Sequence, residues 1–153
     1  MWWEVPGHLE VRNHKLYIAG HDAEALAREY GTPLHALNAD RALENYHTFF
    51  ETMSRQNPGR EVRVHYAMKT NPYFVEFLRG DGAWIDAVSP GEARYAVSKG
   101  YDPQRILYTG SSVSNQNMAD ALDMGVRINI DSPSQMRRLR RILDERGIDV
   151  YGV

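Results

Sequence analysis

The amino-acid sequence predicts an α/β fold in which helices cover a parallel sheet. Three observations support this prediction. From Val62 onward, short apolar runs typical of strands alternate with segments that have helical periodicity. The strands follow one another at intervals of roughly 20 residues, which suits repeated strand–helix units. Glycine or proline stands at most of the boundaries, so the expected elements are clearly separated.

Before Val62 the sequence predicts a hairpin and two helices. Asp22 is a suitable N-cap for the first helix and Gly31 a suitable end. The second helix is indicated by apolar side chains that recur at steps of three and four residues. The expected elements are a strand or hairpin over residues 9–18, a helix over 23–30, an extended piece over 33–37 and a helix over 40–53.

Four strand–helix units and a fifth strand are expected in the remainder of the chain. Pro133 suits the first turn of the last helix, and Gly147 suits its end. The expected strands cover residues 62–68, 84–88, 105–108, 126–130 and 148–153. The expected helices cover residues 72–79, 92–99, 115–124 and 134–146.

An open doubly wound sheet and a (β/α)8 barrel of the TIM-barrel type both fit this order of elements. No G-x-G-x-x-G sequence follows a strand, which disfavours a dinucleotide-binding sheet. A barrel needs eight strands and about 250 residues. We therefore expect the chain to form about half a barrel, with four βα units and a fifth strand, within a larger protein. The expected partner is the remainder of the same polypeptide or a second chain that completes the barrel.

Composition and charge exclude several classes of function. The net charge of −2 gives no basic field for nucleic acid, and the longest apolar runs are too short to span a membrane. The absence of cysteine excludes disulfides and thiol nucleophiles within the chain and fits a cytoplasmic location. The six histidines show no metal-ligand spacing, so no metal site is expected. Arg137–Arg141 is interpreted as a solvated helix face, with Leu139 and Ile142 directed inward.

Lys69 is the principal candidate for chemistry. It is one of three lysines, against fifteen arginines, and it follows the strand-like run Val62–Met68 directly before the turn signal Asn71-Pro72. Catalytic groups of α/β folds gather at the carboxyl ends of strands. A partly buried lysine has a lowered pKa and can act as a nucleophile. The alternative interpretation is a lysine that merely extends to solvent at a strand end.

Four blocks of sequence resemble the pyridoxal-phosphate-dependent decarboxylases with an alanine-racemase-like barrel, the family of the diaminopimelate, ornithine, lysine and arginine decarboxylases. The diaminopimelate branch is the most similar, although Pro90 replaces a glycine and Thr70 an alanine or cysteine of the family's pattern. The likeness extends from about Leu34 to Val153. The blocks are Tyr66-Ala67-Met68-Lys69-Thr70-Asn71-Pro72, Asp86–Glu92, Ile106–Gly110 and Ile128–Ser132.

The resemblance implies a domain organisation. Residues 33–153 would be the N-terminal half of a barrel that binds pyridoxal 5'-phosphate. Residues 1–32 would be an N-terminal segment that pairs with a C-terminal β-domain missing from this chain. The family works as a homodimer with shared active sites. Its phosphate-binding glycine loop, stacking histidine, carboxylate for the pyridine nitrogen and catalytic cysteine would all lie beyond Val153.

The resemblance also assigns roles to residues at the expected strand ends. Lys69 would form the internal aldimine with the cofactor. Asp86, at the end of the next strand, would lie near that lysine and tune its charge; the alternative is a carboxylate in a turn. Ala67 and His65 would also belong to the cofactor-binding site: Ala67 would allow a flat ring to approach closely, and His65 would face the barrel interior. Ordinary packing explains both equally well.

Ser89 has two interpretations. By resemblance it would contact the cofactor. The spacing Ser89 to Glu92 also predicts a capping box, S-x-x-E, at the start of a helix. The two roles are compatible.

The expected activity is the pyridoxal-phosphate-dependent decarboxylation of a basic or diamino acid, most similar to diaminopimelate. The binding partner would be this small amino-acid substrate, and the isolated chain is expected to be inactive. Two alternatives remain open. One is a racemase on the same barrel, which Pro72 after Asn71 disfavours. The other is a non-catalytic relative that binds the cofactor or has a regulatory role.

Overall fold

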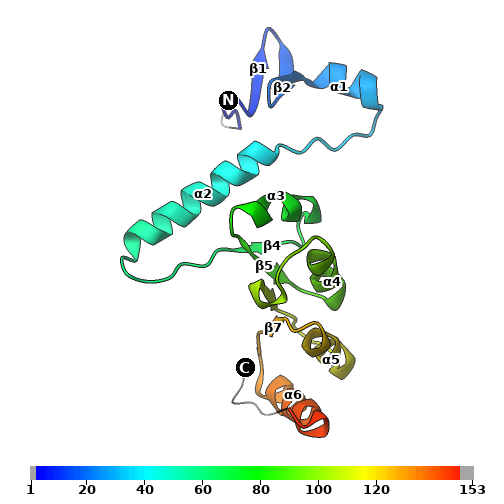
Figure 1. The fold of residues 1–153 in the computed structure, drawn as a ribbon. Helices are drawn as coiled ribbons and strands as arrows, with labels where there is room; N and C mark the ends of the chain where they lie inside the picture. The colour runs from blue at the N-terminus through cyan, green and yellow to red at the C-terminus, as the bar shows by residue number, and fades with distance from the viewer. Residues whose placement is uncertain (1–2, 149–153) are drawn as a thin grey trace. The chain divides into compact units, whose positions relative to one another are not determined.

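The structure is a computed structural model that describes residues 3–148. The chain divides into two compact units, and the boundary lies after Thr48, inside helix α2 (Ala39–Gln56; Figure 1). The strand expected over residues 148–153 lies, apart from Ile148, outside the described residues.

A small antiparallel sheet and a helix make up most of the first unit. Asn13 and His14 form the turn of its hairpin with φ of 49° and 62°, values that suit the tight turns of hairpins. The hairpin and the first helix were predicted correctly, whereas residues 33–37 pair with no strand. None of the described residues up to Thr48 is buried. The elements are β1 (Leu9–Arg12), β2 (Lys15–Ile18), β3 (His21–Asp22) and α1 (Ala23–Tyr30).

Side chains cap both helices of this region. Asp22 Oδ1 accepts hydrogen bonds from the amides of Glu24 and Ala25, at 2.9 and 3.1 Å. This arrangement satisfies amides that have no partner in the first turn of a helix. Asn38 Oδ1 accepts from the Arg41 amide at 3.1 Å and so begins α2. The predicted N-cap of α1 is therefore confirmed.

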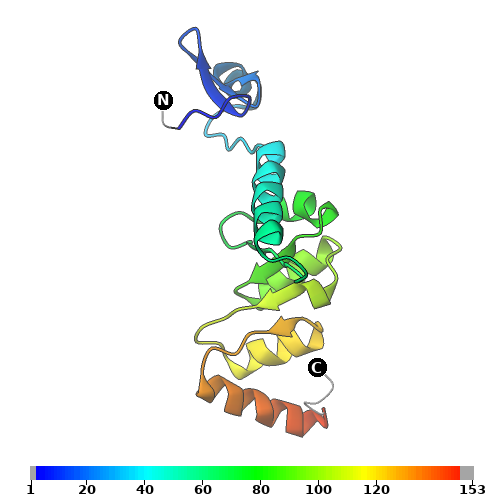
Figure 2. The same ribbon diagram turned by 90° about the vertical axis from the view of Figure 1, so that its left-hand side faces the viewer.

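The second unit contains the predicted parallel sheet with strands and helices in alternation. The strands lie in the order β4-β5-β6-β7, and every neighbouring pair is parallel (Figure 2). The strands are β4 (His65–Ala67), β5 (Trp84–Ala87), β6 (Ile106–Tyr108) and β7 (Arg127–Ile128). The helices are η1 (Pro72–Phe74), α3 (Val75–Gly80), α4 (Pro90–Ser98), η2 (Pro103–Arg105), α5 (Asn115–Asp123) and α6 (Pro133–Arg146).

All four described strands of this sheet are shorter than the sequence predicts, two of them by only one residue. The expected strand over 62–68 is hydrogen-bonded as a strand only over His65–Ala67, and that over 126–130 only over Arg127–Ile128. Both are the outermost strands of the described sheet, with a partner on one side only. The helix expected over 72–79 begins as a 3-10 turn, which Pro72 opens.

One apolar core lies between the sheet and its helices. In Figure 1, α4, α5 and α6 follow one another along the same side of the strands. The predicted inward direction of Leu139 and Ile142 is confirmed, since both are buried while Arg137 and Arg141 are exposed. Core side chains from the strands are Ile85, Ala87, Ile106 and Tyr108; those from the helices are Val75, Ala93, Ala96, Met118, Ala121, Leu139, Ile142 and Leu143.

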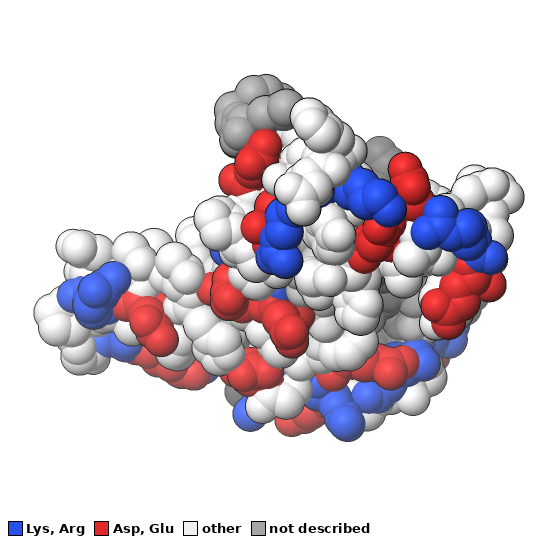
Figure 3. Space-filling model, turned by 90° about the horizontal axis from the view of Figure 1, so that it is seen from above, with Lys and Arg blue, Asp and Glu red and all other residues white. Residues whose placement is uncertain are grey.

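The surface carries charges of both signs. On the face seen in Figure 3, acidic and basic side chains are interspersed. Many of them form exposed ion pairs, such as Arg94 with Asp120 at 3.4 Å. Within residues 3–148, no helix is long and apolar enough to cross a bilayer.

Candidate active site

The face of the sheet opposite the core carries the candidate site. Met68 is buried in the core and Tyr66 packs against it. Because side chains alternate along a strand, His65 and Ala67 of β4 are directed to the opposite face. Two of the predicted site residues thus lie on one face of β4, and Lys69 follows in the turn at the carboxyl end of the strand. We call this surface the site face.

The neighbouring strand adds a carboxylate to the site face. Ile85 and Ala87 of β5 are buried in the core, which leaves Trp84 and Asp86 on the site face. The parallel register pairs Ala67 with Asp86, so these two predicted site residues are direct neighbours. The Asp86 carbonyl also accepts a hydrogen bond from the Met68 amide at 3.3 Å.

Lys69 lies in the turn that follows β4, at the carboxyl end of the strand. This turn is held by Tyr66, whose hydroxyl donates to the Asn71 carbonyl at 2.7 Å, and burial raises the pKa of that hydroxyl. Asn71 Oδ1 in turn accepts from the Tyr73 amide at 3.0 Å. The strand-end position of Lys69 is as predicted. Its side chain is exposed, so the partial burial expected for it is not provided by the described residues.

Three buried polar atoms on the site face have no hydrogen-bond partner among the described residues. They are His65 Nδ1, Asp86 Oδ1 and Thr109 Oγ1. Buried polar atoms in folded proteins nearly always have a partner. The site face is therefore suited to receive further polar groups.

Thr109 did not emerge from the sequence as a site residue. Its amide donates to the Ala87 carbonyl at 2.8 Å, which continues the ladder beyond β6. Since Ile106 and Tyr108 are buried in the core, alternation directs Leu107 and Thr109 to the site face. The same alternation, applied to the sequence, would have identified it.

A stack of rings and guanidinium groups occupies the amino-terminal end of the site face. The His65 and Trp84 rings lie with centroids 5.3 Å apart. The guanidinium carbons of Arg63 and Arg127 lie 4.5 and 5.2 Å from the Trp84 ring centroid. Arg63 also forms two hydrogen bonds with Glu61, at 2.6 and 2.7 Å, and lowers the pKa of that carboxyl. The ends of the face thus differ, with aromatic stacking at one end and Lys69 at the other.

Ser89 and Glu92 cap helix α4. Ser89 Oγ accepts from the Glu92 amide at 3.2 Å, which confirms the predicted cap. The Glu92 carboxylate accepts from the Val88 amide at 2.9 Å, one residue earlier than in a standard capping box. The Ser89 hydroxyl keeps a hydrogen that it can donate, so its contact with a cofactor stays a prediction.

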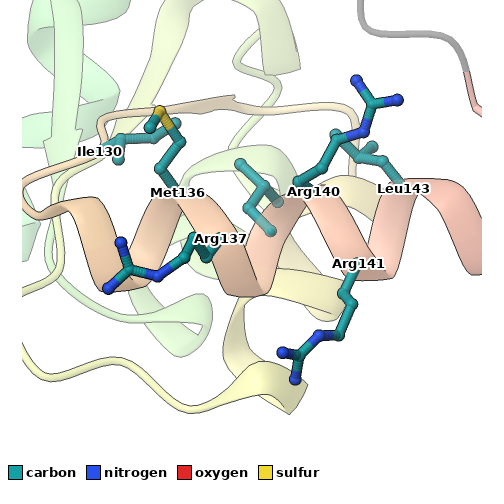
Figure 4. Close-up of a pocket in the computed structure, with 7 residues that line it drawn as sticks. Ile130, Met136, Arg137, Arg140, Arg141 and Leu143 are labelled. Carbon is teal, nitrogen blue, oxygen red and sulfur yellow. The ribbon is translucent and has the colours of Figure 1, made fainter.

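An apolar groove in this unit lies along α6 and contains none of the predicted site residues. Figure 4 shows Met136 beside Ile130, with Arg137 and Arg141 directed away from them. The groove is lined by Ile130, Met136, Arg137, Leu139, Arg140, Arg141 and Leu143.

Within residues 3–148, no three His, Cys, Asp or Glu side chains are grouped so that they could hold a metal ion.

Together, the fold and the site face define part of an α/β barrel with a lysine at the carboxyl end of a strand. Residues 43–151 match the pyridoxal binding domain of the pyridoxal-dependent decarboxylases. Because this match covers most of the sequence, the chain belongs to the pyridoxal-dependent decarboxylase family, whose cofactor is pyridoxal phosphate.

Individual relatives agree with this assignment. The chain is 46% identical over 132 residues to the diaminopimelate decarboxylase of Methanothermobacter thermautotrophicus, a match that covers 85% of this chain and 30% of that enzyme. It is 32% identical over 147 residues to the diaminopimelate decarboxylase of Aquifex aeolicus, covering 94% of this chain and 34% of that enzyme. The chain thus spans about a third of the length of these relatives.

Solved structures share the fold. The diaminopimelate decarboxylase of Methanocaldococcus jannaschii in complex with L-lysine matches with a TM-score of 0.83 at 27% identity, over 92% of this chain and 33% of that one. The lysine decarboxylase of Selenomonas ruminantium matches with a TM-score of 0.65 at 28% identity, over 77% and 30%. The predicted α/β fold, as the N-terminal part of a barrel, is therefore confirmed.

Proposed function

We propose that the protein to which this chain belongs removes a carboxylate from a diamino acid, with diaminopimelate as the substrate. The observation that carries this proposal is Lys69 at the carboxyl end of β4, on the strand next to Asp86. The names of the relatives support the substrate, since three of the four described above are diaminopimelate decarboxylases. In the proposed reaction the bond from the α-carbon to one carboxylate breaks, carbon dioxide leaves and a proton takes its place.

The residues of the site face fit pyridoxal 5'-phosphate. Lys69 offers a primary amine that can hold the aldehyde of the cofactor, and Ala67 has only a methyl group to obstruct a flat ring. Asp86 Oδ1 and Thr109 Oγ1 are buried without hydrogen-bond partners, as expected where a polar ligand supplies those partners. When bound, the cofactor withdraws electrons from the α-carbon of an amino acid, so that carbon dioxide can leave.

Asp86 and Ser89 would support Lys69 in different ways. The Asp86 carboxylate makes no hydrogen bond or ion pair with the described residues, so its charge is available to stabilise the ammonium form of the lysine. Ser89 is fixed at the start of α4 and can donate its hydroxyl hydrogen to an anionic group. His65 remains a predicted neighbour of the cofactor, on the same strand as Ala67.

The domain organisation expected from the sequence belongs to the same proposal. Residues 1–32 would pair with a β-domain, and residues 33–153 would form the N-terminal half of the barrel. The lack of any buried residue among those described up to Thr48 supports a missing partner for the first part. We also propose a homodimer with shared sites and a cytoplasmic location. Light scattering of the full-length polypeptide would test the dimer.

The decisive experiment traps the cofactor on the protein. The full-length polypeptide that contains residues 1–153 is mixed with pyridoxal phosphate and reduced with borohydride, and its peptides are analysed by mass spectrometry. We expect an adduct on Lys69 that is absent from Lys69→Ala. Lys99→Ala is the matched control, because Lys99 is tied to Glu76 in an ion pair on the helix side. An adduct on another lysine alone would contradict the proposal.

Activity assays separate the remaining alternatives. We expect carbon dioxide release from diaminopimelate in the wild type and in Lys99→Ala but not in Lys69→Ala. Release from ornithine or lysine, with none from diaminopimelate, would contradict the proposed substrate. Change of chirality without carbon dioxide release would identify a racemase, and an adduct without either reaction would identify a non-catalytic relative.

A further inference from the structure

We propose that His65 is a positioning residue, which holds the Asp86 carboxylate through a hydrogen bond from its Nδ1–H. The inference rests on the proposed function, because the role of Asp86 beside Lys69 is defined there. Nothing in the resemblance to other decarboxylases gives His65 this role; it follows from two unpartnered atoms and the register of the sheet.

The two atoms are complementary. Both His65 Nδ1 and Asp86 Oδ1 are buried, and neither has a partner among the described residues. An imidazole nitrogen can carry a hydrogen and donate it, whereas an ionised carboxylate oxygen can only accept. In the described structure the two atoms do not bond each other, so the proposed bond requires a rotation of one of the two side chains.

The register of the sheet places the two side chains close together. His65 pairs with Trp84, and Ala67 pairs with Asp86. His65 and Asp86 therefore lie on adjacent strands, on the same face and two residues apart along the ladder, a separation within reach of long side chains. The residue of β4 directly opposite Asp86 is Ala67, whose methyl group takes up little space on this face.

The imidazole of His65 is fixed on its other side. It contacts Trp84 at a centroid distance of 5.3 Å with the planes inclined by 44°. Trp84 is itself held by the guanidinium groups of Arg63 and Arg127. The charged groups that face this end of the site are thus Arg63 with its partner Glu61, Arg127 from β7, and Asp86 itself. A ring fixed in this way can hold a carboxylate in one orientation.

Two substitutions of His65 separate this role from simple packing. Asparagine places an amide nitrogen near the position of Nδ1, whereas glutamine extends its amide toward the position of Nε2. The dissociation constant for pyridoxal phosphate is measured by absorbance on the full-length polypeptide, together with kcat and KM for diaminopimelate. We expect His65→Asn to remain close to the wild type and His65→Gln to raise the dissociation constant about tenfold.

Two further variants complete the design. In an Asp86→Asn background, His65→Gln should change the dissociation constant very little, because the group that His65 holds is altered already. His35→Gln is the control, since His35 is exposed and lies in the other unit. If His65→Gln does not fold, His65→Ala replaces it, because alanine also lacks a donor at the Nδ1 position.

The outcomes distinguish the two proposals. Equal dissociation constants for His65→Asn and His65→Gln, or an undiminished effect of His65→Gln in the Asp86→Asn background, would overturn the role of His65. A wild-type protein that binds no pyridoxal phosphate would instead overturn the proposed function.

Discussion

Asp22 joins the hairpin of the first unit to the first turn of α1. Its Oδ1 accepts the amides of Glu24 and Ala25, and its Oδ2 accepts from Lys15 Nζ at 3.0 Å. The hydrogen bond from Lys15, with the two amides in addition, lowers the pKa of the Asp22 carboxyl below its ordinary value of 3.8. The stabilisation that Asp22 provides is therefore complete above the ordinary pKa and is lost as the pH falls through the lowered one.

This linkage predicts a pH-dependent first turn of α1. We expect the amides of Glu24 and Ala25 to lose protection from hydrogen exchange between about pH 5 and about pH 2, after correction for the intrinsic rates. Asp22→Ser keeps an N-cap oxygen but has no carboxyl group, so its protection should change little over this range. The measurement is hydrogen exchange in the intact protein, followed in the segment that contains α1. The same loss in both proteins would show that Asp22 is not the titrating group.

Lys69 marks how far a single residue can be understood from sequence. Its place at a strand end could be predicted, because a parallel sheet gathers the carboxyl ends of its strands at one edge. Its exposure could not, because the burial of a side chain after β4 depends on whatever else reaches that edge. The lack of a hydrogen-bond partner for Asp86 Oδ1 could not be predicted either, because it depends on which groups surround the neighbouring strand.

At the scale of the element, the start of α4 depends on Ser89. Its hydroxyl accepts the Glu92 amide, and no other side-chain oxygen caps this helix end at that amide. We expect Ser89→Ala to lower the free energy of unfolding by about 1 kcal/mol, and Ser89→Asp to restore most of it. Urea denaturation of the full-length polypeptide, followed by circular dichroism, measures both.

The same pair of variants separates the two interpretations of Ser89. If the residue only caps α4, the affinity for pyridoxal phosphate should be equal in Ser89→Ala and the wild type once both are fully folded. If Ser89 also contacts the cofactor, both variants should bind more weakly than the wild type. A stability unchanged in Ser89→Ala would contradict the capping role.

Gly91 in α4 and Gly110 after β6 differ in whether a methyl group can be added at their Cα atoms. A Cβ at Gly110 would collide with Val113 Cγ1 and lie 2.8 Å from the Tyr108 hydroxyl. A Cβ at Gly91 would meet nothing nearer than Ser89 Oγ at 3.7 Å. We expect Gly110→Ala to destabilise the protein by about 1–3 kcal/mol, and Gly91→Ala to stabilise it by up to about 1 kcal/mol. Thermal unfolding of the two variants side by side tests this, and a stable Gly110→Ala would show that the Val113 loop moves freely.

Helix ends could be predicted from the sequence better than strand ends. The caps Asp22, Ser89 and Ser132 all act on amides two or three residues further along the chain, so their effect is local. A strand ends where its neighbour ceases to pair, and that neighbour lies some twenty residues away. The alternating run over 62–68 marks an extended chain correctly, yet only His65–Ala67 has the full ladder with β5. Partner-dependent features of this kind are absent from any local pattern.

At the scale of the whole molecule, the two units have unequal cores. The second unit buries a continuous cluster between the sheet and its helices, from Val75 to Leu143. The described part of the first unit has no buried residue and depends on a three-stranded sheet, one helix and local hydrogen bonds. A small sheet with so little buried area is marginal by itself. The first unit is therefore expected to be the less stable of the two.

The second unit also exposes apolar surface in the groove along α6. In the groove along α6, Ile130 is 42% exposed and Met136 54% exposed. Apolar grooves of this kind promote association. We therefore expect the 153-residue chain, produced alone, to self-associate in a way that depends on its concentration. Co-production with the remainder of the polypeptide should abolish this association.

Substitutions in the groove test whether it is the surface responsible. We expect Ile130→Ser with Met136→Gln to lower the average mass of the chain in light scattering, with the helical content unchanged. Phe77→Gln is the matched control, because Phe77 is 48% exposed on α3 and does not line the groove. If the control lowers the mass equally, association is non-specific. If the chain alone is a monodisperse monomer, the groove along α6 does not drive association.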